Sequence, residues 1–169
     1  MNIQFYVQQL TNSANAIHAM TQNTSVEQAR WKPDANSWSL LEVINHLYDE
    51  EREDFRAHLR GVLQVPILPF SNIDPQAWVT ERRYQERDFE TSLENFLRER
   101  VDSLSWLKSL DSQDWNAAYE WPEGRLTAGD LLVSWAAHDL LHIRQINELR
   151  YAFASQVSLP HAVRYAGEW

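Results

Sequence analysis

Residues 134–146, with the sequence SWAAHDLLHIRQI, decide how this chain is expected to fold. His138 and His142 stand four positions apart, and apolar residues recur on both sides of them at spacings of three or four. Such spacing places side chains on one face of an α-helix, the face that a helical bundle buries. This face contains Leu131, Trp135, His138, His142, Ile146, Leu149 and Phe153.

An imidazole on a buried face needs a polar partner, because an unpaired polar group is costly to bury. One metal ion would satisfy both rings, since histidines one helical turn apart can chelate a single ion. The alternative is a pair of core histidines that bond to backbone groups or to a carboxylate such as Asp139. Spacing alone favours this alternative, because the His-x3-His pattern arises often by chance. Two rings also leave an ion under-coordinated, so a further ligand would have to come from elsewhere.

The overall charge and the lack of cysteine narrow the class of protein. The 169 residues carry a formal net charge of −9 and include no cysteine. An acidic chain argues against partners such as nucleic acid or an anionic membrane surface, both of which usually need basic patches. Without cysteine there are no disulfides, thiolate ligands, iron–sulfur clusters or cysteine nucleophile.

The remaining composition is typical of a helical protein. Only 4 glycines and 6 prolines accompany 8 tryptophans, and strand-like runs rich in β-branched residues do not appear. Tryptophans that gather at one end of a bundle would form an apolar pocket wall. The candidates in predicted loops or helix starts are Trp31, Trp38, Trp78 and Trp121.

We expect a single domain over residues 1–169, a length that can bury a core without cross-links. The first residues, MNIQFY, lack the basic start and apolar run of a signal peptide. No apolar stretch reaches the roughly 18 to 20 residues that span a bilayer. A cytoplasmic protein is therefore expected.

Four segments have the periodicity of long helices. The first covers about residues 3–20 and the third about residues 89–110. The second ends at about residue 63 and the fourth at about residue 153. Both begin with a capping box, in which two side chains each bond to the other residue's backbone. These boxes pair Ser39 with Glu42 and Thr127 with Asp130. In the third segment the predicted buried stripe is Leu93, Phe96, Leu97, Val101, Leu104 and Leu107.

The connections set the order of these helices. Residues 65–87 lose helical periodicity, apart from a short helix that Asp74 and Pro75 are predicted to open. So long a connection can run the length of the molecule and leave the second and third helices parallel. Residues 112–125 are predicted to form a loop, and residues 155–169 an irregular tail. The acidic run over residues 49–54 is predicted to be a solvated helix face.

Few other motifs carry chemistry. His46 falls just past the edge of the apolar face of the second helix, a position that suits either a pocket residue or an exposed one. His18, His58 and His161 have no partner at ligand spacing and are predicted to be surface or packing residues. The chain has no Glu-x-x-His pair for a di-iron bundle and no H-E-x-x-H motif. Phosphate loops, dinucleotide-binding glycines and G-x-S-x-G elbows are absent too.

Two motifs in combination resemble the DinB/YfiT-like superfamily. Residues 38–47, WSLLEVINHL, are followed in the fourth predicted helix by His138-x3-His142-Ile143-x-Gln145-Ile146. The resemblance covers nearly the whole chain and includes residues 31–33, WKP, and residues 110–115, LDSQDW. Each motif is weak alone, but their order at this length is specific.

The resemblance implies an all-α fold: a four-helix bundle in up-down-down-up order, with a long connection between helices two and three. It also implies one divalent metal ion held by three histidines, which by position are His46, His138 and His142. Relatives include transferases that use low-molecular-weight thiols and a thiol-dependent isomerase, and many form homodimers. The superfamily is named after DNA-damage induction, but nothing in this acidic sequence supports action on DNA.

The implied function is that of a metal-dependent thiol S-transferase or hydrolase, in which the ion activates a small thiol or water for attack on a small electrophilic substrate. Zinc is the expected ion, with nickel, iron and manganese as alternatives. Glu50, one turn after His46, is the candidate general base, and Asp139 is a candidate for fixing an imidazole tautomer. Arg144 and Gln145 could reach a carboxylate or ring nitrogen of a ligand, but a surface position is expected for both. The alternative function is a non-catalytic metal-binding or dimerisation bundle.

Overall fold

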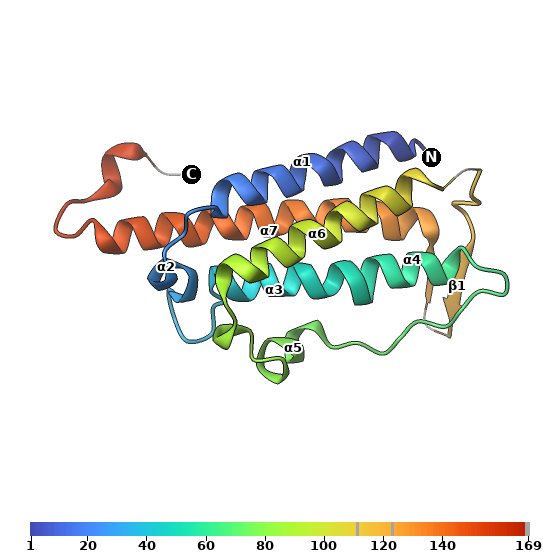
Figure 1. Ribbon diagram of the computed structural model, residues 1–169, viewed down its shortest axis with the longest axis horizontal. Coiled ribbons are helices and arrows are strands. Elements are labelled where there is room, and N and C mark those ends of the chain that lie inside the picture. Colours follow the sequence, from blue (N-terminus) through green and yellow to red (C-terminus); the bar gives the residue numbers. More distant parts are fainter. Residues whose placement is uncertain (111, 123, 168–169) are drawn as a thin grey trace.

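The computed structural model describes residues 1–110, 112–122 and 124–167. Its long helical segments lie along one axis (Figure 1). They are α1 (Ile3–Thr21), α3 (Leu40–Glu50) with its continuation α4 (Arg56–Val62), α6 (Phe89–Lys108) and α7 (Ala128–Val157). In Figure 1, α1 and α7 run from right to left, while α3, α4 and α6 run from left to right. The predicted up-down-down-up bundle is therefore confirmed.

The connection between α4 and α6 runs back along the bundle beneath α3 and α4 (Figure 1). It contains the short helix α5 (Pro75–Glu81), whose N-cap Asp74 accepts a hydrogen bond from the backbone of Ala77, as the sequence predicted. A 3-10 turn, η2 (Tyr84–Glu86), follows. Another short helix, α2 (Val26–Arg30), leads from α1 toward α3. Among the described residues, no helix is long and apolar enough to cross a membrane.

Residues 112–125 are not the simple loop that the sequence predicted. They include β1 (Ala118–Trp121), which pairs antiparallel with β2 (Gly124–Thr127) in the register Ala118 with Thr127 through Trp121 with Gly124. A Cβ at Gly124 would lie 2.5 Å from the Trp121 ring, so a larger residue there would require this ring to move. Strands this short give too little alternation to distinguish a hairpin from a loop. Asp111 and Glu123, part of the predicted motifs and loop, lie outside the described residues.

Both capping boxes are confirmed. The Ser39 hydroxyl accepts a hydrogen bond from the Glu42 backbone at 3.2 Å, and the Glu42 carboxylate accepts one from the Ser39 backbone at 2.7 Å. The same reciprocal pair joins Thr127 and Asp130 at the start of α7. At its other end, α7 extends to Val157, and η3 (Val163–Ala166) follows, so the tail is more ordered than predicted.

The predicted stripe of α6 is wrong at one position. Val101 is 64% exposed, whereas its neighbour Arg100 is only 1% exposed. The guanidinium of Arg100 bonds to both carboxylate oxygens of Glu51, at 2.8 Å each, and to those of Asp139 at 2.7 and 2.9 Å. Trp135 adds a hydrogen bond from its indole nitrogen to Glu51. Two carboxylates draw this arginine inward, which apolar periodicity does not reveal.

The acidic run after His46 is also not the solvated face that the sequence predicted. Asp49, Glu50 and Glu51 are all buried. The helix passes from α3 into a π-helix, η1 (Glu51–Phe55), before α4 begins. A π-turn changes the angular positions of the residues in it, so a projection at 3.6 residues per turn misplaces Glu51. Asp49 and Glu50 precede this turn and are buried by polar partners, Tyr84 for Asp49 and His138 for Glu50. Several of these carboxylates therefore point into the bundle.

Candidate metal centre

Three histidines from two helices meet in the middle of the bundle. His46 on α3 and His138 and His142 on α7 each offer a nitrogen atom, and these atoms all lie within 4.8 Å of one another. The ring centroids are 4.4 to 5.4 Å apart. The structure thus brings together the three histidines that the family resemblance indicated. His18 and His161 are exposed, and His58 is buried against Asp54, away from this cluster.

The cluster favours neutral imidazoles. Burial, reinforced by the neighbouring His142 and His138, lowers the pKa of His46 to about 2. Burial also lowers the pKa of His142 to about 4, with a smaller contribution from His138. A neutral ring keeps one nitrogen lone pair, which is the form that binds a metal ion. At neutral pH, His46 and His142 are therefore already uncharged. A metal ion would not have to displace a proton from either imidazolium in order to bind.

These depressed pKa values predict acid sensitivity of the metal-free protein. A histidine with a pKa near 6.5 when unfolded and near 2 when folded binds more protons unfolded, so stability falls as pH drops below about 6.5. When the pH is lowered from 7.5 to 5, protonation of His46 in the unfolded chain is expected to lower the unfolding free energy by about 2 kcal/mol. Urea unfolding of chelator-treated protein measures this loss. H46Q should lose less stability than wild type over the same range, and equal losses would contradict the assignment.

Gln145 fixes which nitrogen of His142 carries the proton. The amide oxygen of Gln145 lies 2.7 Å from Nδ1 of His142, and because that oxygen can only accept, Nδ1 carries the hydrogen. The lone pair is then on Nε2, which lies 3.0 Å from Nε2 of His138. A histidine that binds a metal ion through one ring nitrogen typically donates a hydrogen bond from the other, and this bond fixes the orientation of the ring. Gln145 also lines the pocket described below, so its contact with His142 leaves a further contact with a substrate open.

Glu50 lies beside the cluster. Its carboxylate oxygens are 2.8 Å from Nε2 of His138 and 3.5 Å from Nε2 of His46, and the side chain is 8% exposed. This carboxylate also lines the adjoining pocket, so it can meet both the histidines and a bound molecule. Asp139, by contrast, bonds to Arg100, and no hydrogen bond to an imidazole is found for it in the described structure.

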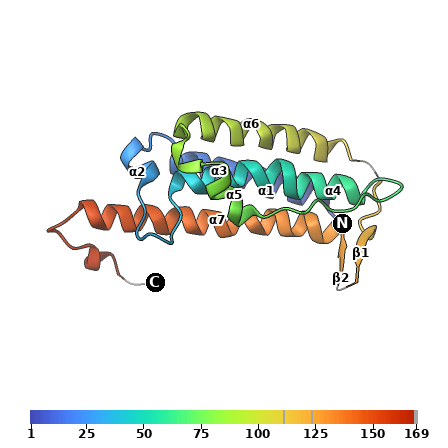
Figure 2. The ribbon, with the colours of Figure 1, turned by 90° about the horizontal axis from the view of Figure 1, so that it is seen from below.

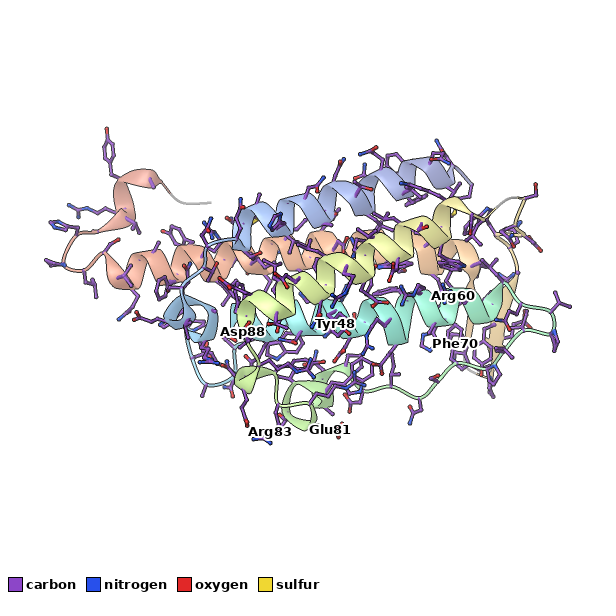
Figure 3. All side chains as sticks on the ribbon, viewed as in Figure 1. Tyr48, Arg60, Phe70, Glu81, Arg83 and Asp88 are labelled. Atoms are coloured by element: carbon purple, nitrogen blue, oxygen red, sulfur yellow. The ribbon has the colours of Figure 1, made fainter. Side chains whose placement is uncertain are left out.

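Aromatic rings wall the cluster. The Trp38 ring lies edge-on to His46 at 4.7 Å and parallel to His142 at 6.5 Å. Phe55, which belongs to the π-helix, lies 5.0 Å from the ring of His138. Of the four tryptophans predicted as wall candidates, only Trp38 lines the pocket described below. Phe70, labelled in Figure 3, belongs to a separate aromatic group, in which it stacks on Tyr119 of the hairpin.

A pocket of about 650 Å³ opens onto the cluster. It lies between α7, the start of α5 and the segment that joins α2 to α3; Figure 2 shows this segment beside α7. Sequence reasoning missed most of its polar lining, because the residues come from loops without periodicity. The lining is Pro33, Asn36, Ser37, Trp38, His46, Glu50, Gln76, His138, His142, Gln145, Glu148, Leu149 and Ala152.

The fold and the site define a class: a four-helix bundle with three histidines, two of them one turn apart, at the floor of a pocket. Residues 9–146 match the DinB superfamily, and the chain belongs to that superfamily. The fold is similar to that of YfiT from Bacillus subtilis, at a TM-score of 0.77 and 17% identity over 90% of this chain and 87% of that one. YfiT is described as a probable metal-dependent hydrolase with an unusual four-helix bundle topology. No curated protein matches the chain.

Proposed function

We propose that His46, His138 and His142 hold one divalent metal ion. Support comes from their convergence within 4.8 Å, from the neutral state of the two buried rings, and from the tautomer that Gln145 imposes. Imidazole ligands suit zinc, and nickel, iron and manganese are alternatives. Three neutral ligands are typical of catalytic sites, because structural zinc sites are usually closed by a fourth protein ligand.

We further propose that the protein is a metal-dependent hydrolase or thiol S-transferase acting on a small electrophile. The observation that carries this proposal is a buried carboxylate, Glu50, that contacts two of the histidines and lines the same pocket. When bound, the ion supplies a Lewis acid that makes water or a thiol easier to deprotonate. Glu50 would accept that proton, and its distance of 2.8 Å from His138 supports this role. Trp38 packs edge-on against His46 on one side of the site. Hydrolysis is the first candidate, because YfiT is described as a probable hydrolase.

Replacing Glu50 by glutamine tests this role. E50Q keeps the size and one hydrogen-bonding oxygen but cannot accept the proton, so kcat is expected to fall about 10²- to 10⁴-fold. Zinc-loaded wild type and variant are compared on a panel of small esters and amides, and on thiol transfer to aryl halides. Zinc content per chain is measured on the same samples and is expected to stay unchanged.

The control is E90Q, because Glu90 is an exposed glutamate on α6 that does not line the pocket. It should retain wild-type turnover. Zinc-dependent turnover that survives in E50Q would contradict the role of Glu50. Zinc binding without turnover of any substrate in the panel would favour the alternative function, a metal-binding or dimerisation module.

A further inference from the structure

The pocket extends away from the histidines along one helix. Beyond His142, the side chains of Gln145, Glu148, Leu149 and Ala152 continue its lining along α7. An α-helix rises 1.5 Å per residue, so Glu148 stands about 9 Å along the axis from His142. A molecule that reaches from the cluster to Glu148 therefore has an elongated tail.

The charges of the lining have one sign. Glu50 and Glu148 are its carboxylates, and the described part of the lining contains no lysine or arginine. Two cations lie near the lining: Lys32 bonds to Glu42 at 2.7 Å, and Arg144, a 76% exposed side chain, pairs with Glu148. The Arg144 nitrogen lies 2.8 Å from one oxygen of Glu148, whose side chain is 50% exposed, and an exposed pair of this kind contributes little, so an ammonium can compete for the carboxylate.

The remaining walls suit an uncharged chain that ends in a hydrogen-bond donor. Pro33, Leu149 and Ala152 are apolar, and the indole of Trp38 presents a surface that also attracts cations. Three neutral polar residues complete the rim: Asn36, Ser37 and Gln76. An anionic tail would find no lysine or arginine in the described lining and would meet the Glu148 carboxylate, whereas an ammonium could pair with that carboxylate in place of Arg144.

We propose that this pocket selects a small substrate with an amine or other cationic group at the end distant from the metal centre, and that Glu148 recognises this group. The inference rests on the proposed function, because the metal centre fixes the other end of the molecule. Glu148 acts on substrate affinity and takes no part in the chemical step.

Three hydroxamates that share one metal-binding head test this selectivity. Their six-carbon chains end in an amine, a methyl group or a carboxylate, and their binding to zinc-loaded protein is measured by calorimetry at low salt. The amine is expected to bind about tenfold more tightly than the carboxylate, with the methyl compound between them. In E148Q this ratio should shrink to about threefold or less, while zinc content and affinity for the methyl compound stay unchanged.

The matched control is again E90Q, which makes the same charge change away from the pocket and should keep the tenfold ratio. Equal affinities for the amine and the carboxylate, a preference for the carboxylate, or an unchanged ratio in E148Q would overturn the inference and leave the metal centre intact. Failure of the protein to bind zinc, or of zinc-loaded protein to bind any of the hydroxamates, would overturn the proposed function together with it.

Discussion

Replacing His138 by alanine is expected to abolish stoichiometric metal binding. The variant leaves His46 and His142, and two imidazoles leave a divalent ion under-coordinated. Loss of a direct ligand should weaken binding by more than the 10- to 100-fold that loss of an outer hydrogen-bond partner costs. His138 suits this test because its side chain is 19% exposed, so truncation there disturbs packing less than truncation of the buried His46.

The measurement is metal content per chain, determined on protein purified without an affinity tag and confirmed by titration against a coloured chelator. H18A, which removes an exposed histidine of α1, is the control and should bind one equivalent like wild type. Unchanged metal content in H138A would refute the three-histidine site. Loss of metal in both variants would point to nonspecific binding.

Replacing Arg100 by methionine is expected to cost about 3 to 5 kcal/mol of unfolding free energy. The reason is that Glu51 and Asp139 would remain, each 1% exposed, without the guanidinium that bonds to both. Removal of one partner from a buried charge network leaves uncompensated charge in the interior. Since Asp139 adjoins His138, this network also anchors the part of α7 that carries the metal centre.

Urea unfolding at pH 7.5 measures the effect of R100M. The matched control is R98M, two positions away on the same helix, where the side chain is exposed and the change should stay within about 0.5 kcal/mol. Similar small losses in both variants would show that the network contributes little. Replacing Glu51 and Asp139 by glutamine and asparagine in the R100M background should recover part of the loss, because the unpaired charges are then gone.

The helices were predictable because their start signals are local. A capping box such as Ser39 with Glu42 needs only four consecutive residues, and the structure contains it as predicted. The hairpin of residues 118–121 and 124–127 was missed because its two strands are too short to show a clear alternation of side chains. The burial of Arg100 was missed because its carboxylate partners come from two other helices, and apolar periodicity does not reveal them.

The candidate site was partly predictable. The spacing of His138 and His142 placed them on one face, but it favoured ordinary core histidines until family resemblance added His46. Glu50 could not be placed from the sequence, because a mixed acidic run on a helix usually faces solvent. Only tertiary packing shows that its carboxylate lies 2.8 Å from His138. The loop residues of the pocket, such as Gln76, gave no periodic signal at all.

Anomalous scattering from a crystal of untagged, zinc-supplemented protein tests the metal centre most directly. Data collected on both sides of the zinc absorption edge should give one strong difference peak per chain, located between the imidazoles of His46, His138 and His142 and beside Glu50. The absence of a peak at that position, or a peak held by other side chains, would contradict the metal centre proposed for this protein.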